Sequence, residues 1–323
     1  MIVKTRNRPL YIQKLQALLR RLPKNHSKIP FIQETLAKHT AGYRGEHSID
    51  YPLSFLSPQN YYIVHDLRLP HNEYHFQIDT LLISPYYLFI LEVKNIAGTL
   101  FFDQDFHQLI RTLDDKVEVF PDPILQVKRH KVQLTSWLNK HKLPDIPIET
   151  LVVISHPNSQ IQTSPPHQQY VRRKVIHRNA LPFKINQIEG RYNEAILSIK
   201  QLKKITRLLL KQHNSSDSSV MEQFNIHSKD IIKGVHCPEC FQIPMERVHG
   251  TWLCAQCLHT CKTAHIEALR DYSYLIQSTI SNREARDFLK INSNPLASRI
   301  LQSISTETEG NQRGRTYHLT FED

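Results

Sequence analysis

The sequence predicts an α/β or α+β core joined to a small zinc-binding and helical region. Helical and strand-like segments follow one another over residues 1–212, in the order expected for a mixed sheet flanked by helices. Two Cys-x-x-Cys pairs come next, beginning at Cys237 and Cys254. The polar stretch NSSDSS at 214–219 lies between the two regions and indicates a linker within 214–233. The chain length of 323 residues also favours about two domains.

Residues 1–39 are expected to form a helical extension. Apolar residues near helical spacing indicate an amphipathic helix over 1–22, which Pro23 would end. A second helix is expected over 31–38. The stretch AGYRGE at 41–46 follows, and further helical sequence continues as far as Leu56.

The strands of the predicted core lie within residues 40–213. Segments rich in β-branched and aromatic residues indicate four strands, over 61–69, 75–83, 86–94 and 98–103. A break at Ser84-Pro85 makes the second and third strands a hairpin. Five later segments complete the core: a helix over 123–141, a buried central strand over 149–155, a loop over 156–169, an edge strand over 171–178 and a long helix over 194–212.

Three charged residues interrupt strands that are otherwise suited to burial. Asp79 ends the apolar part of one strand, and Glu92 and Lys94 lie in the next. Buried charges are costly unless they bind something. Two carboxylates beside a lysine suit a hard divalent cation, Mg²⁺ or Mn²⁺, that activates water for phosphodiester cleavage, and the carbonyl of Val93 could be a further ligand. The alternative is that these charges face water at a strand edge.

Two further segments could contribute to such a site. Glu46 precedes the strands and could supply another acidic ligand or a water contact. Gln126 and His130 are four residues apart and therefore share one helix face. Together with Lys128 and Arg129, His130 could line a groove that holds a phosphate backbone. The alternative is a solvated basic helix face.

Several segments together resemble the NERD (nuclease-related) domain, which is similar to the PD-(D/E)xK nuclease superfamily: AGYRGE (41–46), HDLRL (65–69), FQIDTLLIS (76–84), ILEVKNIAG (90–98) and DPILQVKRH (122–130). The N-terminal MIVKTRNRP and the sequence to about residue 210 resemble the extended form found in bacilli and related bacteria. The resemblance implies a nuclease-like core with Asp79 and Glu92 as the acidic pair, Lys94 as the lysine, Glu46 as the early glutamate and Gln126 as the helical glutamine. The superfamily also includes members that have turned to binding or structural work. The resemblance therefore implies a capacity for catalysis and not catalytic activity itself.

A zinc ribbon is predicted over 234–262, with four ligands: Cys237, Cys240, Cys254 and Cys257. Each Cys-x-x-Cys pair places two thiolates at the close spacing that tetrahedral Zn²⁺ requires. Four cysteines leave no open coordination position, so this zinc is expected to be structural. Trp252 and Met245 are expected in the core beneath the ligands. Unrelated thiol pairs or a redox-active pair are the alternatives.

Residues 263–323 are expected to form three short helices and a β tail, over about 265–279, 282–289, 295–303 and 315–321. Ser281 and Glu284 match a capping box at the start of the second helix. The order of the segments resembles a winged helix-turn-helix with Arg313 and Arg315 in the wing. Its third helix would read DNA, with four residues expected to be exposed: Asn294, Ser298, Arg299 and Gln302. The alternative is a helical module for protein contacts.

The formal net charge of +11 favours a polyanionic partner, and nucleic acid is expected over a membrane surface. Because the sequence has no signal-peptide pattern and no apolar run of membrane-spanning length, we expect a soluble, cytoplasmic protein. The combined expectation is a metal-dependent nuclease, acting on DNA in particular, that its zinc ribbon and helix-turn-helix tail deliver to the substrate. The alternatives are a catalytically silent DNA-binding or regulatory protein and a protein-interaction scaffold. The sequence does not decide whether the substrate is DNA or RNA, whether cleavage is endo- or exonucleolytic, or what the oligomeric state is.

Overall fold

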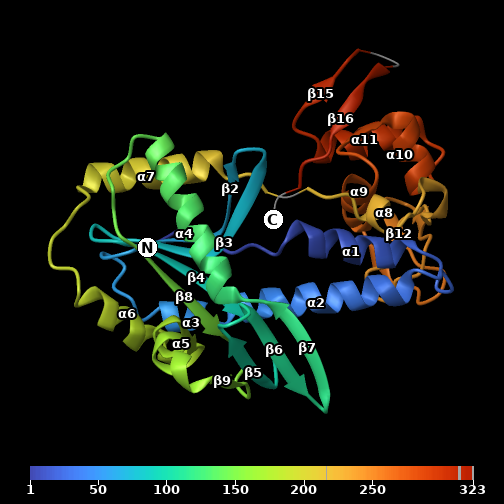
Figure 1. The fold of residues 1–323 in the computed structure, drawn as a ribbon. Helices are drawn as coiled ribbons and strands as arrows, with labels where there is room; N and C mark the ends of the chain where they lie inside the picture. Colours follow the sequence, from blue (N-terminus) through green and yellow to red (C-terminus); the bar gives the residue numbers. More distant parts are fainter. Residues whose placement is uncertain (216, 312–313, 322–323) are drawn as a thin grey trace. The chain divides into compact units, whose positions relative to one another are not determined.

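The computed structural model describes residues 1–215, 217–311 and 314–321, and these form two compact units (Figure 1). Unit 1 comprises residues 1–8 and 40–215, and unit 2 comprises residues 9–39 and the described residues after 216. The first 39 residues are thus divided between the units, which differs from the single helical extension expected from the sequence. Arg313 lies outside the described residues.

The main sheet of unit 1 has six strands in the order β1-β2-β3-β4-β8-β10. Their bounds are β1 (Ile2–Lys4), β2 (Tyr62–His71), β3 (Tyr74–Ile83), β4 (Leu88–Lys94), β8 (Ile148–Ile154) and β10 (Val175–His177). Strands β2, β3 and β4 are antiparallel, whereas β1, β8 and β10 each run parallel to a neighbour. This mixed sheet with helical cover confirms the predicted α+β class, and β8 occupies the predicted interior position.

Alternating side chains of β4 enter two separate hydrophobic cores, because successive residues of a strand face opposite sides of the sheet. Ile90 packs in the core that α4 (Pro123–Lys140) and α7 (Ile199–Gln212) cover. Leu91 packs in the core that α3 (Asp50–Leu53) and α6 (Leu181–Glu189) cover. Both residues are fully buried. Charged groups at the end of this strand are therefore held by rigid, buried surroundings.

A second sheet of unit 1 has four strands in the order β7-β6-β5-β9. Its strands are β5 (Thr99–Asp103), β6 (Gln108–Leu113), β7 (Lys116–Pro121) and β9 (Gln160–Thr163). Only β5 was predicted. Strand β7 is mostly exposed and β9 lies in the stretch expected as a loop, so neither shows a strong apolar pattern. Asp114 and Asp115, both with positive φ (48° and 60°), form the two-residue turn between β6 and β7 and are the signal that could have revealed this hairpin.

Several predicted boundaries in unit 1 and the N-terminal region were wrong. The helix expected over 1–22 begins only at Leu10, since residues 2–4 form β1 beside β2. The AGYRGE stretch is not an interruption but the end of α2 (Ile29–His47). The edge strand expected over 171–178 is a helix, α5 (Gln168–Lys174), followed by the short edge strand β10. Short 3-10 turns occupy Pro165–His167, Arg178–Ala180 and Ser228–Asp230.

Unit 2 contains two small three-stranded sheets and its helices. The helices are α1 (Leu10–Arg21), α8 (Val220–Gln223), α9 (Ala264–Leu275), α10 (Asn282–Leu289) and α11 (Asn294–Ile304). The strands are β11 (Glu246–Val248), β12 (Thr251–Leu253) and β13 (Thr260–Cys261) in one sheet, and β14 (Thr279–Ser281), β15 (Thr308–Glu309) and β16 (Thr316–His318) in the other. The predicted capping box at Ser281 and Glu284 is present at the start of α10.

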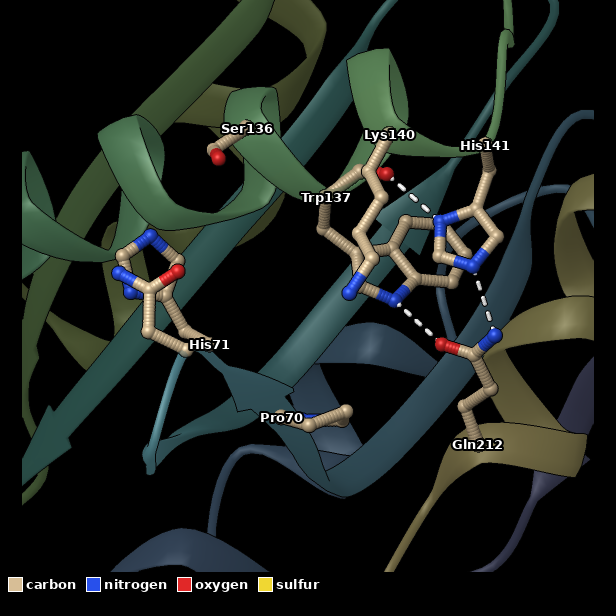
Figure 2. A pocket seen from close by; sticks show the side chains of 8 residues that line it. Pro70, His71, Ser136, Trp137, Lys140, His141 and Gln212 are labelled. Carbon is tan, nitrogen blue, oxygen red and sulfur yellow. Dashed lines mark hydrogen bonds between the residues drawn. The ribbon is translucent and has the colours of Figure 1, made fainter.

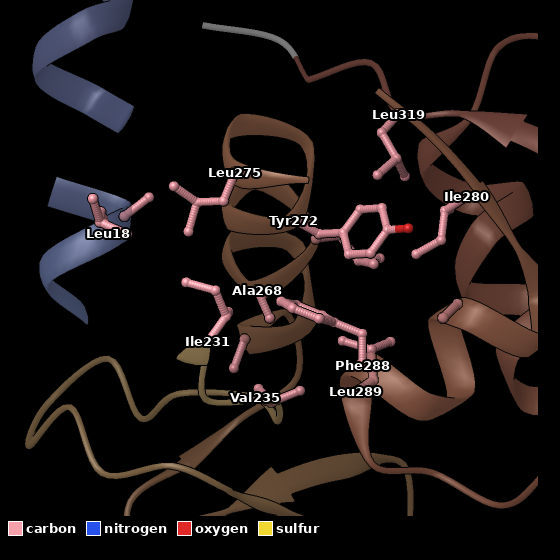
Figure 3. Packing of buried hydrophobic residues seen from close by; sticks show 14 of the residues in the cluster. Leu18, Ile231, Val235, Ala268, Tyr272, Leu275, Ile280, Phe288, Leu289 and Leu319 are labelled. Carbon is pink, nitrogen blue, oxygen red and sulfur yellow. The ribbon is translucent and has the colours of Figure 1, made fainter. Parts of the chain in front are cut away.

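One hydrophobic cluster joins the parts of unit 2 (Figure 3). Leu18 of α1 and Tyr272 of α9 belong to it, together with Phe288 of α10. Trp252 and Met245 are also buried in this cluster, as predicted. Beside it, the buried Arg21 guanidinium donates to the fully buried Asp271 carboxylate at 2.8 Å. A buried ion pair of this kind is costly to break, so it fastens α1 to α9.

Over the described residues, no helix is both long enough and apolar enough to cross a membrane. The cytoplasmic location expected from the sequence stays a prediction.

Candidate active site and zinc site

Asp79 lies where strands β3 and β4 separate. The pairing of these strands ends at Thr80 and Leu91, one residue short of Asp79. The Asp79 carboxylate instead accepts a hydrogen bond of 2.8 Å from the backbone N–H of Val93. On its other side, Asp66 of β2 interrupts the ladder with a φ of 48°. The carboxylate is therefore held in the opening between the strands by the backbone N–H of Val93, which would bond to the neighbouring strand if the regular β pairing continued.

Glu92, Lys94 and Gln126 form a closed hydrogen-bonded triangle. The Lys94 ammonium donates to Glu92 Oε1 at 2.8 Å and to Gln126 Oε1 at 3.1 Å. The Gln126 amide donates to the same Glu92 oxygen at 2.8 Å. Glu92 and Lys94 share a face of β4 because side chains alternate along a strand, and Gln126 reaches them from the first turns of α4. The structure thus brings together three of the residues predicted for the site.

The second oxygen of Glu92, Oε2, is buried and has no hydrogen-bond partner. His130 Nδ1 of α4 lies 3.8 Å from this oxygen and also has no hydrogen-bond partner. Burial lowers the pKa of His130 to about 4, so the ring is neutral at pH 7. His130 is only 8% exposed and faces Glu92, so it lies inside the site and its expected contact with nucleic acid stays a prediction. It shares an inward helix face with Gln126.

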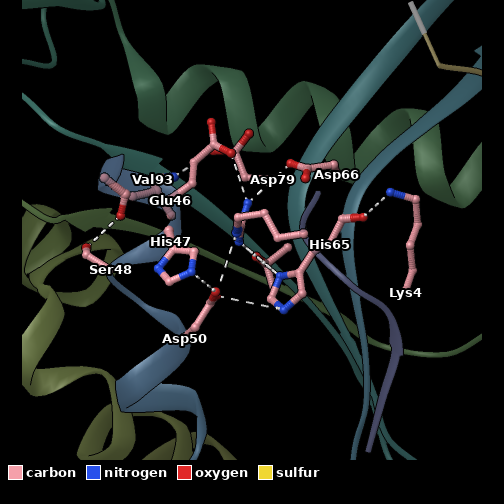
Figure 4. A network of polar contacts seen from close by, with 12 residues as sticks. Lys4, Glu46, His47, Ser48, Asp50, His65, Asp66, Asp79 and Val93 are labelled. Carbon is pink, nitrogen blue, oxygen red and sulfur yellow. Dashed lines mark hydrogen bonds and ion pairs between the residues drawn. The ribbon is translucent and has the colours of Figure 1, made fainter. Parts of the chain in front are cut away.

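Arg6 connects Glu46 to the sheet, and the sequence analysis missed it. Its guanidinium lies 2.9 Å from the Glu46 carboxylate, 3.2 Å from Asp66 and 3.6 Å from Asp50. The Arg6 side chain is only 1% exposed. Strand β1, which lies parallel to β2, carries this residue into the cluster from the N-terminus. Figure 4 shows the surrounding network, in which Glu46, Asp50 and Asp66 converge.

A buried histidine completes the Arg6 network. Arg6 approaches His65 Nδ1 at 2.9 Å and donates to the Thr80 hydroxyl at 2.9 Å. Burial, followed by the charge of Arg6, lowers the pKa of His65 to about 3. The ring is therefore neutral and accepts from Arg6, which places the guanidinium charge between Glu46 and the sheet.

The carboxylates of the cluster hold their protons more tightly than usual. Burial raises the pKa of Asp79 well above its ordinary range, and repulsion by Glu92 and Glu46 adds to this. Burial also raises the pKa of Glu92, against the stabilising charge of Lys94. Burial and repulsion by Asp66 raise the pKa of Glu46 to about 7. Three acids with raised pKa values mark a place where a cation would be favourable.

Gly45 allows α2 to approach the end of β4 closely. A Cβ atom at this position would lie 2.4 Å from Asn95 Cβ and 2.8 Å from the Ser155 hydroxyl. Asn95 also donates a hydrogen bond of 2.7 Å to the carbonyl of Ala41 in the same helix. The glycine therefore sets the distance between Glu46 on α2 and the charged end of β4.

The donor chemistry of this cluster suits a hard divalent cation. Asp79 and Glu92 supply carboxylate oxygens, one of which is the buried, unpartnered Oε2, and the carbonyl of Val93 is a possible third donor. Within the described part of the chain, Glu46 does not join these two acids in a set whose ligand atoms all lie within 4.8 Å. A Mg²⁺ or Mn²⁺ ion here would therefore keep several water ligands.

The four predicted zinc ligands converge in unit 2, with their sulfur atoms all within 4.8 Å of one another. The Sγ atoms of Cys237 and Cys257 are 3.6 Å apart, and those of Cys240 and Cys254 are 3.5 Å apart. Tetrahedral Zn²⁺ with bonds of about 2.3 Å separates its sulfurs by roughly 3.8 Å, so the set fits zinc.

The two cysteine pairs have the same backbone geometry. The first cysteine of each pair accepts a hydrogen bond from the residue four positions on, Phe241 at 3.0 Å and Leu258 at 2.9 Å. Both of these residues adopt a left-handed conformation, with φ of 59° and 60°. This repeated turn presents each pair of sulfurs toward the other, which is the arrangement of a closed, structural zinc site.

The surface residues predicted to contact nucleic acid lie in both units. Lys128 and Arg129 are exposed on α4, and the Lys128 ammonium lies 5.1 Å from the centre of the Tyr170 ring. Arg299 is exposed on α11, and Arg315 is exposed just before β16. All four are accessible to a polyanion, in contrast to His130.

A small pocket of about 230 Å³ in unit 1 is lined by residues of β2, α4 and α7 and the turn after β2 (Figure 2). Its lining includes none of the predicted catalytic residues. The indole N–H of Trp137 donates to Gln212 at 2.8 Å, and Gln212 in turn lies 2.6 Å from His141 Nε2. Because these polar groups satisfy one another, the pocket offers a ligand few directed contacts.

Comparison with known proteins agrees with the geometry. Residues 41–155 match the NERD family, described as a nuclease-related domain. The chain is also 26% identical over 142 residues to an uncharacterized protein of Bacillus anthracis, a match that covers 43% of this chain and 63% of that protein's length. No solved structure matches at a significant level. The chain therefore carries a nuclease-related domain, and the five predicted catalytic residues fall within it: Glu46, Asp79, Glu92, Lys94 and Gln126.

Proposed function

We propose that this protein is a metal-dependent nuclease that hydrolyses phosphodiester bonds of nucleic acid, DNA in particular. The observation that carries the proposal is the meeting of Asp79, Glu92 and Lys94 at the point where β3 and β4 part, inside the nuclease-related domain. The unpartnered Glu92 oxygen supports a cation ligand at this point.

Each residue of the cluster has a distinct task in such a reaction. Asp79 and Glu92 hold the cation, which when bound polarises the phosphate and makes a water molecule more acidic. Lys94, held by Glu92 and Gln126, donates to the attacking water or to a phosphate oxygen. Glu46 is suited to accept a proton from that water, since a group with a pKa near 7 is an effective base at neutral pH.

The tail of unit 2 is proposed to bind DNA. Its elements follow in the order α9, β14, α10, α11, β15 and β16, and its sheet order is β14-β16-β15, an order that resembles a winged helix. Asn294, Arg299 and Gln302 are exposed on α11, whereas Ser298 is bound to Asn282 at 2.9 Å. A structural zinc at the four cysteines would hold the adjoining ribbon rigid.

A catalytically silent DNA-binding protein is the second candidate. The triangle of Glu92, Lys94 and Gln126 is complete without a substrate, and such a network can persist for the stability of the fold. The two candidates differ in whether the acidic pair binds Mg²⁺ or Mn²⁺, so calorimetric titration with each metal separates them. Tight DNA binding without any metal signal would favour the silent protein.

The central experiment compares wild type with Asp79→Asn on plasmid, single-stranded DNA and RNA, with Mg²⁺ or Mn²⁺. We expect cleavage by wild type and a loss of at least about a hundredfold in the variant, because one of two metal-binding charges is removed. Asp114→Asn is the matched control, since Asp114 is exposed in the β6–β7 turn and Asn tolerates its φ of 48°. Equal activity of wild type and Asp79→Asn on every substrate would refute the proposal.

A further inference from the structure

Four aromatic side chains follow one another at intervals of four residues beside the candidate active site: Tyr43, His47, Tyr51 and Phe55. The first two lie on α2, which ends at His47, and the others lie on α3 and directly after it. Backbone hydrogen bonds from Ile49 to Glu46 and from Leu53 to Ile49 keep the chain nearly helical between the two elements. Residues four apart are neighbours on a helical surface. The rings form two consecutive pairs, Tyr43 with His47 and Tyr51 with Phe55, which we call the aromatic row.

The far end of this aromatic row is exposed to solvent. Tyr51 is 73% exposed and Phe55 is 64% exposed, and their ring centres are 5.1 Å apart in an edge-to-face arrangement. The rings of Tyr43 and His47 are 6.1 Å apart. Large aromatic residues that are paired with each other and exposed are unusual unless they meet a ligand or partner.

His47 of the aromatic row lies beside the acidic cluster. His47 Nε2 lies 3.9 Å from the Asp50 carboxylate, which itself lies 3.6 Å from Arg6. Glu46 directly precedes His47, and Figure 4 shows His47 beside Asp50 and below Glu46. The aromatic row therefore passes Asp50 and the end of α2 that bears Glu46.

Positive charge accompanies the row. Arg44 is exposed on α2 between the first two aromatic residues. Helix α6, which packs against α3 in one hydrophobic core, carries the exposed Phe183 and ends beside the exposed Arg191. Exposed rings interleaved with cations are the combination that binds a flexible polyanion with flat, unpaired bases.

We propose that the aromatic row stacks the bases of single-stranded nucleic acid, so that this site takes single strands in preference to duplex. The inference rests on the proposed nuclease function for its substrate class. The bases of a single strand expose their faces and can lie on Tyr51 and Phe55, whereas the bases of a duplex are stacked on one another and shielded.

The test measures binding of a short fluorescent oligothymidylate and of a duplex of equal length by anisotropy, in buffer without Mg²⁺ or Mn²⁺ so that no cleavage occurs. We expect the double variant Tyr51→Ala/Phe55→Ala to bind the single strand at least about tenfold more weakly and the duplex within about twofold of wild type. Because both side chains are exposed, their truncation leaves the core intact. Phe106→Ala is the matched control, since Phe106 is 80% exposed in the β5–β6 turn.

Two further measurements keep the result specific to stacking. The double variant Tyr51→Phe/Phe55→Tyr keeps both rings and should retain wild-type affinity. Fluorescence of 2-aminopurine placed in the oligonucleotide should be quenched on binding to wild type and not to the alanine variant.

The outcomes separate this inference from the proposed nuclease function. Equal affinities of wild type and alanine variant for the single strand, or equal weakening for single strand and duplex, would overturn the stacking role, even if the protein cleaves nucleic acid. In that case the exposed rings would be assigned to a protein partner. Ring-dependent binding of single strands by a protein that cleaves nothing would sustain the inference and refute the nuclease.

Discussion

The backbone N–H of Val93 donates a hydrogen bond of 2.8 Å to the carboxylate of Asp79 across the gap between two diverging strands. This bond places a negative charge where burial and the carboxylates of Glu92 and Glu46 oppose it. The position of Asp79 is thus unfavourable for the protein without metal and favourable for binding a cation. A charge in such a position lowers the stability of the metal-free protein and is kept because it binds the cation.

Asp79→Asn should stabilise the metal-free protein, because the amide oxygen can still accept from Val93 while the repulsive charge is gone. We expect the free energy of unfolding without added Mg²⁺ or Mn²⁺ to rise by about 1–2 kcal/mol, as judged by urea denaturation. Adding Mg²⁺ should raise the stability of wild type and leave that of the variant unchanged. A variant less stable than wild type without added Mg²⁺ or Mn²⁺ would contradict this account of Asp79.

Arg6→Ala should destabilise unit 1 strongly, because it leaves Glu46, Asp50 and Asp66 without their buried cation. Removing one partner of a buried ion pair costs about 3–5 kcal/mol. Arg129→Ala, at an exposed position of α4, should change the free energy of unfolding by less than about 0.5 kcal/mol. Chemical denaturation of both variants at pH 7 measures the difference, and similar values for the two would argue against the Arg6 network.

The stability that Glu46 contributes to the metal-free protein should fall as pH rises from about 4.5 to about 7. The buried rings of His65 and His130, whose pKa values are lowered, change stability in the opposite direction below about pH 6.5. The folded protein raises the pKa of Glu46 to about 7 from its ordinary value of 4.5, so the folded state binds the proton more tightly than the unfolded state. This contribution is fully present below the unfolded pKa and is lost as pH passes the folded pKa, at a total of up to roughly 3 kcal/mol. The free energy of unfolding of wild type, measured relative to that of Glu46→Gln at several pH values, should therefore fall across this range.

Two glycines of α2 provide a matched pair for the spacing between this helix and β4. Gly45→Ala should cost about 1–3 kcal/mol, because the new Cβ meets Asn95 and Ser155. Gly42→Ala should stabilise the protein by up to about 1 kcal/mol, since nothing lies within 4 Å of its Cβ position and alanine favours a helix. Thermal unfolding of the two variants tests this, and equal shifts would contradict the close approach of α2.

Removing zinc should unfold the ribbon in unit 2. Binding of Zn²⁺ by four cysteines supplies on the order of 10–16 kcal/mol to a small domain, and Trp252 packs beneath this site. A strong chelator should release one zinc per chain, measured by metal analysis, and should change the fluorescence of Trp252 by exposing it to solvent. Cys237→Ser should show the same exposed Trp252 and lack the zinc. Cys261→Ser should leave the zinc content unchanged, because Cys261 is not among the four converging sulfurs.

The charged residues of β3 and β4 could be predicted because they are out of place in apolar strands. Asp79, Glu92 and Lys94 break a pattern that otherwise indicates burial, and the resemblance to a nuclease-related domain extended the set to Glu46 and Gln126. The zinc ligands could also be predicted directly, because each Cys-x-x-Cys pair brings two thiolates to the spacing that tetrahedral zinc requires.

Arg6 could not be predicted, because its role depends on tertiary contacts rather than on local pattern. Strand β1 has only three residues, too few for a periodic signal, and its partner β2 lies about sixty residues further along the chain. His130 differs, since a usable signal existed. It lies four positions after the inward-facing Gln126, and this spacing places both residues on the same helix face.

Arg6 also lies outside residues 41–155, the stretch that matches the nuclease-related family. A fragment cut to those limits would retain every predicted catalytic side chain and lose the guanidinium that neutralises Glu46, Asp50 and Asp66. Such a fragment would also lose helices α6 and α7, which cover the two cores, so its failure to cut nucleic acid would not report the chemistry of the whole chain. Biochemical work on this protein should therefore keep its first eight residues.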